Sequence, residues 1–277
     1  MRNVECDIPE VDLGGGLRLA QVTNNTFESI KEQFPGITIN KQGLHWSLEF
    51  SAKWLLRLHD LFVLLRLFSS GNLCFEAISI HNANEGWGTL GHYPILSSFP
   101  PGYLKWRLSE EDAAGFEEFA CRLHSSPGWD SAWFVVASRM FLLSSSLEFN
   151  LHWGSYEPWA LIRPLGYMVG LEAALVPERD FVGRRLRERA ARLLGLDGDA
   201  ADAMRDRLQV MYDIRSKLAH GSPLLDRDTC ALKANMPEFE SDVRKILCAA
   251  LRGVPKDECE RRGYLSGLYD VTDSDRV

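Results

Sequence analysis

Apolar residues recur every three or four positions through the second half of the chain, which is the spacing of one helix face. Glycine or proline stands at the end of most of these runs, where helices commonly stop. The connections between runs are short, as they are between antiparallel neighbours in a helical bundle. The helices predicted in this way cover about residues 131–149, 157–175, 180–194, 199–219 and 237–251.

The first half of the chain carries a more varied pattern. Apolar positions from Trp46 to Phe68 again recur at helical spacing and predict one long helix. Short alternating runs on either side of it predict strands, and Ser109 is a good N-cap for a helix that runs to about His124. The predicted fold class is therefore mainly α, with a C-terminal antiparallel helical bundle preceded by a smaller mixed α/β N-terminal region.

Three stretches of the chain differ in character. Residues 1–127 form the mixed α/β region, to which we assign no role, and residues 128–255 form the helical bundle. Residues 256–277 are a polar C-terminal tail with weak patterning, and we expect this tail to fray. No internal repeat or low-complexity tract divides the chain further.

Composition narrows the class of protein without identifying it. Hydrophobic residues make up 45% of the 277 positions and charged residues 25%, which is usual for a globular protein. The longest apolar region, 54–68, contains charged residues and is shorter than the roughly 20 apolar residues of a membrane span. The six cysteines are scattered without a CxxC pair, and the N-terminus lacks the apolar core of a secretory signal. We therefore expect a cytoplasmic protein with no membrane contact, no metal and no cofactor.

Charge is segregated along the chain. The net charge of −7 argues against a general nucleic-acid coat protein, but it leaves room for a local basic cleft. Residues 179–192 contain six arginines against two acids. Arg185 and Arg189 in this segment are candidate contacts to RNA phosphates. A solvated helix face is the other interpretation of the same residues.

The predicted helix 199–219 combines a core stripe with two polar residues at its end. The stripe consists of Met204, Leu208, Met211, Ile214 and Leu218. Arg215 and His220 lie off this stripe and about 140° apart on a regular helix. Gly221 ends the helix, so His220 falls in its last turn or cap, where geometry can depart from the ideal.

An arginine and a histidine suit metal-free cleavage of RNA. Histidine gains and loses a proton near neutral pH, as acid–base catalysis requires. The forked guanidinium of Arg215 can bind a phosphate and the extra charge of the transition state. RNA carries its own nucleophile, the 2′-hydroxyl, so one proton-transfer group and one phosphate clamp can suffice.

Three segments of the chain carry a resemblance to a known family. The stretch from Tyr212 to Gly221 reads YDIRSKLAHG, and it resembles the R-x4-H signature of HEPN domains, specifically the Apea-like branch. The segment 170–175 (GLEAAL) resembles the family's "LEaLl" helix, and the segment 189–195 (RAARLLG) resembles its "RiA-LLg" segment. Together these segments place the resemblance over roughly residues 130–252.

The resemblance implies both a fold and an activity. It implies a HEPN-like bundle of four to five helices that forms a homodimer, so that two Arg/His pairs meet in one groove. Catalytic members of the family are metal-independent endoribonucleases that leave a 2′,3′-cyclic phosphate and a 5′-hydroxyl. Many of them act in phage defence or in toxin–antitoxin systems. We therefore predict an RNA substrate, and an antitoxin or other regulatory partner remains open.

The predicted site extends beyond the motif. Arg215 and His220 are the predicted catalytic residues, and Glu172 is predicted to orient one of them. Glu172 lies within an apolar helix, and a sheltered carboxylate needs a partner such as Arg215 or His220. Lys217 and Ser216 are predicted contacts to RNA, together with the arginines Arg189 and Arg185.

Other interpretations stay open at this stage. Arg215 could be an ordinary surface arginine paired with Asp213 or Glu172, and His220 could be a histidine that satisfies carbonyl groups at the end of the helix. The bundle could be a non-catalytic HEPN module that binds RNA, a nucleotide or a partner protein. The activity could also reside in the N-terminal region, with the bundle serving only for dimerisation.

Overall fold

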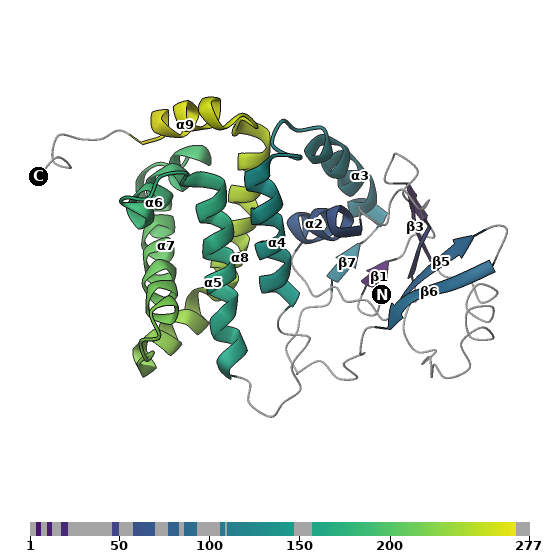
Figure 1. Ribbon diagram of the computed structural model, residues 1–277, viewed down its shortest axis with the longest axis horizontal. Helices are drawn as coiled ribbons and strands as arrows, with labels where there is room; N and C mark the ends of the chain where they lie inside the picture. The colour runs from purple at the N-terminus through teal and green to yellow at the C-terminus, as the bar shows by residue number, and fades with distance from the viewer. Residues whose placement is uncertain are drawn as a thin grey trace, which may run out of the picture. The chain divides into compact units, whose positions relative to one another are not determined.

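The computed structural model of the chain describes residues 4–6, 10–12, 18–21, 46–49, 58–69, 77–82, 86–92, 106–108, 110–146 and 157–269. The chain divides into two compact units, Met1–Arg122 and Leu123–Val277. Within the described residues the chain is mainly α-helical (Figure 1). The prediction of a mainly α fold with a helical bundle is confirmed.

The strands of the first unit form three small sheets. Strand β1 (Val4–Cys6) pairs in parallel with β7 (Trp106–Leu108). Strands β2 (Glu10–Asp12), β3 (Arg18–Gln21) and β4 (Trp46–Glu49) form an antiparallel sheet in that order. Strands β5 (Ala77–Asn82) and β6 (Gly86–His92) form an antiparallel pair with an irregularity between Ile78 and Ser79.

The helices of the first unit are α2 (Leu58–Phe68) and α3 (Glu110–His124). The ring centroids of Phe68 and Phe116 lie 5.2 Å apart, and this edge-on contact joins the two helices. The prediction of a helix from Trp46 is wrong, because Trp46–Glu49 is strand β4 and pairs with β3. Four residues that alternate apolar and polar fit both the helical and the strand pattern, and pairing with β3 makes them a strand.

The second unit is a bundle of six helices within the described residues. Four of them, α4 (Ala132–Ser146), α5 (Glu157–Leu175), α7 (Gly198–Ala219) and α8 (Asp226–Gly253), lie side by side (Figure 1). Helix α6 (Val182–Leu193) packs against α7, and α9 (Glu258–Gly267) lies across one end of the bundle (Figure 1). None of the helices among the described residues is long and apolar enough to cross a membrane.

Helix α5 is the central helix, since it contacts α4, α6, α7 and α8. Its residues Tyr167, Met168 and Leu171 are fully buried. Helix α7 faces it with the predicted stripe, of which Met204, Leu208, Met211 and Ile214 are buried and Leu218 is partly exposed. Burial of this apolar surface is the main force that holds the bundle together.

Two predictions for the C-terminal part of the chain are wrong. Helix α8 begins at Asp226, eleven residues before Pro237, which we had taken as its start. Pro237 has no N–H, so the carbonyl of Lys233 lacks its intrahelical donor. Both residues are exposed, so water can satisfy this carbonyl. The tail that we expected to fray contains α9, whose first turn is capped by the carboxylate of Asp257.

Two buried arginines cap the C-terminal end of α5. Arg189, on α6, is fully buried and donates to the carbonyl oxygen of Leu175 at 2.8 Å and to that of Leu265 at 2.8 Å. The same guanidinium forms a bidentate pair with Glu178, at 2.6 and 2.7 Å. Arg261, on α9, donates to the carbonyl oxygens of Ala173 and Ala174. The last carbonyls of a helix have no intrahelical partner, and these arginines supply one.

Arg189→Ala should lower the free energy of unfolding by about 3 to 5 kcal/mol, because it leaves Glu178 and two carbonyl groups without their buried cation. Arg262→Ala is the matched control, since Arg262 is exposed and pairs with Glu258 only at the surface. Its cost should stay within about 0.5 kcal/mol. Urea denaturation measures both, and equal stability of the two variants would contradict the role of the cap.

Candidate functional site

Arg215 and Glu172 form an ion pair between the two helices that share the bundle core. Nη2 of Arg215, on α7, donates to Oε2 of Glu172, on α5, at 2.9 Å. The side chain of Arg215 is 24% exposed and that of Glu172 is 17% exposed. The sequence predicted that Glu172 would need a partner, and Arg215 is that partner. The pair lies at the edge of the core, so it is partly screened from water but remains reachable.

The pair leaves two polar atoms unsatisfied. Oε1 of Glu172 and Nε of Arg215 are buried and have no hydrogen-bond partner among the described residues. Burial raises the pKa of the Glu172 carboxyl above its ordinary value, and the charge and hydrogen bond of Arg215 offset this only in part. A buried acceptor and a buried donor side by side favour a water or a ligand that can bond to both.

The guanidinium of Arg215 lies over the ring of Tyr212. The guanidinium carbon of Arg215 lies 5.9 Å from the centre of the Tyr212 ring, one turn earlier on α7. The same ring also lies against Gly183 of α6, where a Cβ atom would lie only 2.9 Å from the ring. Glycine is therefore required at this position for α6 to approach α7 so closely.

His220 lies at the C-terminal end of α7, where a glycine stops the helix. Gly221 has a φ of +67°, the left-handed conformation that favours glycine. Its N–H donates to the carbonyl of Leu218, and the N–H of Ser222 donates to that of Lys217 at 2.8 Å. These two bonds form a Schellman motif, which fixes the end of the helix. The side chain of His220 is exposed at this fixed end.

The helix end does not turn His220 toward Arg215. The N–H of His220 still donates to the carbonyl of Ser216 at 3.1 Å, as in a regular helix. Its φ and ψ are −95° and 6°, so the main chain departs from the regular helix only at His220 itself. The Cβ of His220 therefore leaves the helix about 140° around the axis from Arg215 and about 7.5 Å further along it. Within one chain the helix end therefore does not bring the two side chains together, and a cleft shared with a second copy stays a prediction.

Lys217 forms an ion pair that holds the loop between α7 and the start of α8. Its ammonium group donates to both oxygens of Asp228, at 2.7 and 2.8 Å, and Asp228 also accepts from the N–H of Leu225. The hydrogen bond from Lys217 holds the pKa of Asp228 below its ordinary value, and the Leu225 N–H adds to this effect. Lys217 therefore has a structural role, and since its side chain stays one third exposed, its contact with RNA stays a prediction. Ser216 is partly exposed, and its contact with RNA stays a prediction.

Sequence reasoning missed Asp228. Its signal was present, since a carboxylate three residues after a helix N-cap often accepts from the N-cap N–H. We overlooked it because we placed the start of that helix at Pro237.

The two arginines predicted to contact RNA on α6 are engaged within the protein. The prediction for Arg189 is wrong, because its guanidinium is 0% exposed and bonded to Glu178 and two carbonyl groups. Arg185 pairs with Glu178 and with Asp180, each at 3.2 Å, and its guanidinium carbon lies 5.1 Å from the centre of the Tyr269 ring. Arg185 keeps a small exposed fraction, so its contact with RNA stays a prediction that these bonds do not favour.

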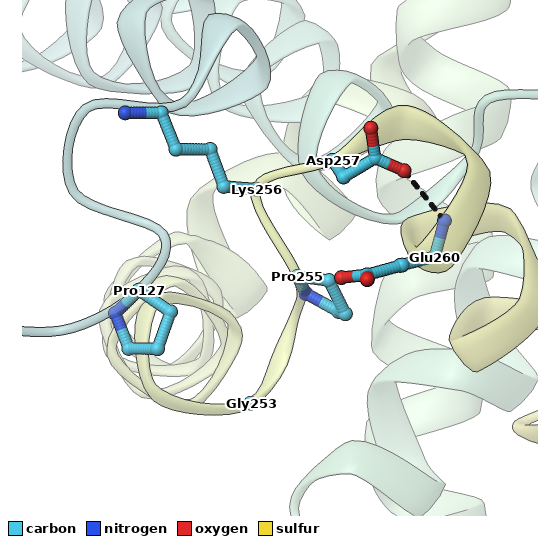
Figure 2. Close-up of a pocket in the computed structure, with 6 residues that line it drawn as sticks. All are labelled: Pro127, Gly253, Pro255, Lys256, Asp257 and Glu260. Atoms are coloured by element: carbon cyan, nitrogen blue, oxygen red, sulfur yellow. Dashed lines mark hydrogen bonds between the residues drawn. The ribbon is translucent and has the colours of Figure 1, made fainter.

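A hollow of about 640 Å³ lies elsewhere on the second unit, and Figure 2 shows the residues that line it. The lining is formed by Pro127, Gly253, Pro255, Lys256, Asp257 and Glu260. Its one lysine is outnumbered by two carboxylates, one of which caps α9, so this hollow does not suit an anion (Figure 2). No group of three or more metal-ligating side chains lies together in the part of the chain that the structure describes.

Arg215→Ala should raise the pKa of Glu172 further, because Arg215 supplies both interactions that favour the carboxylate. Carbon-13 NMR of the side-chain carboxyl groups, titrated with pH, measures this value. Arg163→Ala is the matched control, since it removes the arginine of α5 that pairs with Glu240 on α8 at 2.7 Å. It should leave the pKa of Glu172 unchanged, and an unchanged or lower value in Arg215→Ala would refute the assignment.

Glu172→Gln should flatten part of the dependence of stability on pH. The pKa of Glu172 is raised on folding, so the folded state holds this proton more tightly than the unfolded state does. The contribution of Glu172 to stability therefore falls as pH rises from its ordinary value through the raised one. Subtracting the unfolding free energies of the two proteins across this window isolates the effect, and a difference that is constant with pH would argue against it.

Comparison of the chain with models of protein families, with curated proteins and with solved structures finds no match. The candidate site is therefore defined by contacts within the chain: the Arg215–Glu172 pair on its tyrosine support, and the exposed His220 at the end of the same helix.

Proposed function

We propose that the protein is a metal-independent endoribonuclease of HEPN type. The observation that carries this proposal is the partly exposed Arg215–Glu172 pair, which keeps a donor and an acceptor without partners, on the helix that ends in an exposed histidine. The resemblance of the motif and of two upstream segments supports the same function. The proposed bundle is HEPN-like, preceded by a mixed α/β N-terminal region.

The proposed reaction is attack by the 2′-hydroxyl of RNA on the adjacent phosphorus. The 2′-oxygen loses its proton and forms the new P–O bond, while the bond from phosphorus to the 5′-oxygen breaks. The leaving 5′-oxygen takes up a proton, so the products are a 2′,3′-cyclic phosphate and a 5′-hydroxyl. His220 moves protons, and Arg215 stabilises the charge that develops on the phosphate oxygens.

Glu172 has a positioning role in this scheme. It holds the guanidinium of Arg215 through Nη2 and leaves Nε for a phosphate oxygen, which a small rotation of the side chain would expose. Its free Oε1 can accept a hydrogen bond from a ribose hydroxyl.

The proposed active form is a homodimer. In-line displacement places the attacking and leaving oxygens on opposite sides of the phosphorus, so one imidazole cannot reach both at once. A second copy supplies a second His220, and it also compensates for the angle between Arg215 and His220 on one helix. A role in phage defence or in a toxin–antitoxin system, with an antitoxin or regulatory partner, rests on the resemblance alone.

A non-catalytic module that binds RNA, a nucleotide or a protein is the second candidate. The closed ion pair favours it, because Arg215 must give up part of its bond with Glu172 to reach a phosphate. This candidate predicts binding without any product that carries a 2′,3′-cyclic phosphate.

His220→Ala should reduce RNA cleavage by purified protein in EDTA by about 100- to 10,000-fold, the usual contribution of general acid–base catalysis. Arg215→Ala should reduce it by about 100- to 1,000-fold through loss of charge stabilisation. The cleavage rate and the chemical ends of the products are measured together, because only cleavage through the 2′-hydroxyl leaves a cyclic phosphate.

Matched substitutions separate chemistry from folding. His124→Ala removes another exposed histidine, and Arg163→Ala breaks another interhelical arginine–glutamate pair. Both controls should keep their activity while folded. Retained cleavage in both His220→Ala and Arg215→Ala would refute the assignment, and binding without cyclic-phosphate products would establish the second candidate.

A further inference from the structure

Phe181 combines two unusual features at the start of α6. Its side chain is 61% exposed, more than any other large hydrophobic side chain among the described residues. It is also the one non-glycine residue with a positive φ in that part of the chain, with φ of 51° and ψ of 33°. This left-handed conformation is costly for a residue with a bulky side chain, and asparagine or glycine would adopt it more easily.

The surrounding contacts explain how the conformation is held. The carbonyl oxygen of Phe181 accepts the first hydrogen bond of α6, from the N–H of Arg185 at 2.9 Å. Two residues after Phe181, Gly183 is pressed against the ring of Tyr212. These contacts fix the main chain, but they do not account for an aromatic side chain directed into water. Strained residues of this kind gather at functional sites.

The position of Phe181 places it beside the candidate site. Gly183 touches the Tyr212 ring, and the same ring lies 5.9 Å from the guanidinium carbon of Arg215. Phe181 is thus connected to the proposed phosphate clamp through one glycine and one tyrosine ring. A short stretch of RNA bound at Arg215 can extend to this aromatic side chain.

The charges around Phe181 favour an anionic ligand. Arg179 and Arg184 are both exposed, two positions before and three positions after Phe181. The neighbouring acid, Asp180, forms an ion pair with Arg185 at 3.2 Å. An exposed ring between exposed cations is the arrangement by which proteins hold single-stranded nucleic acid, through stacking on the base and attraction of its phosphates.

We infer that Phe181 is a stacking platform for an unpaired base of single-stranded RNA, next to the phosphate bound by Arg215. This inference rests on the proposed function, since it concerns the same substrate. It assigns selection of unpaired RNA to α6, whereas the chemistry belongs to the end of α7.

The test measures binding separately from cleavage. Each variant is made in the full chain that also carries His220→Ala, and it is titrated with a short single-stranded RNA containing 2-aminopurine, whose fluorescence falls on stacking. Phe181→Asn should weaken binding about 5- to 150-fold and abolish the quenching, which is the usual effect of losing one stacked base. Phe181→Trp should retain both. Asparagine tolerates the left-handed conformation, so Phe181→Asn should be at least as stable as the parent protein.

Leu143→Asn serves as the matched control, because Leu143 is 49% exposed and lies on α4, outside the candidate site. It should bind RNA as the parent does. The inference is overturned if Phe181→Asn binds RNA as tightly as the parent protein does. This holds also where Phe181→Asn loses only the binding of a protein partner. Absence of RNA binding by every variant also overturns it. Quenching that depends on Phe181, in a protein whose unaltered form produces no cyclic phosphate, upholds the inference and refutes the proposed cleavage.

Discussion

The C-terminal end of α5 depends on cations that come from two other helices. A helix ends with carbonyl groups that lack donors, and here that end is buried rather than exposed to water. Arg189 and Arg261 supply the donors, and Glu178 balances the charge of Arg189 through two short hydrogen bonds. Burial alone would raise the pKa of Glu178, but the bonds from Arg189 hold it below its ordinary value. Glu172 lies one residue before the first capped carbonyl, so the cap also fixes the carboxylate that pairs with Arg215.

This constraint sets two of the six arginines of residues 179–192 apart from two others. Arg189 and Arg185 lie toward the cap and Tyr269, and they serve the fold. Arg179 and Arg184 are exposed near Phe181, and the proposed contact with single-stranded RNA includes these two. The sequence shows how many charges this segment carries but not which partner each arginine binds, because the carbonyl of Leu265 reaches Arg189 only when α9 folds across the bundle.

The long helices could be predicted, because their apolar residues keep one period over many turns. The helices α3 to α7 lie within a few residues of their predicted positions, and the buried stripe of α7 was identified from spacing alone. Short or contradictory signals failed: Trp46–Glu49 is too short to separate strand from helix, and Pro237 suggested a helix start where it lies inside one. At the site, the need of Glu172 for a partner followed from its apolar neighbours. The roles of Lys217 and Arg189 did not, because each is set by a residue on another element.

The angle between Arg215 and His220 constrains any catalytic scheme. The Schellman motif fixes the main chain at His220, and the Lys217–Asp228 pair fastens the connection that follows, so a swing of the helix end would break several bonds at once. Arg215 is held in turn by Glu172 and by the ring of Tyr212. Rearrangement within one chain is therefore costly. Association of two rigid copies breaks none of these bonds, and for this reason the proposed reaction favours a dimeric site, in which one copy's histidine approaches the phosphate that the other copy's arginine binds.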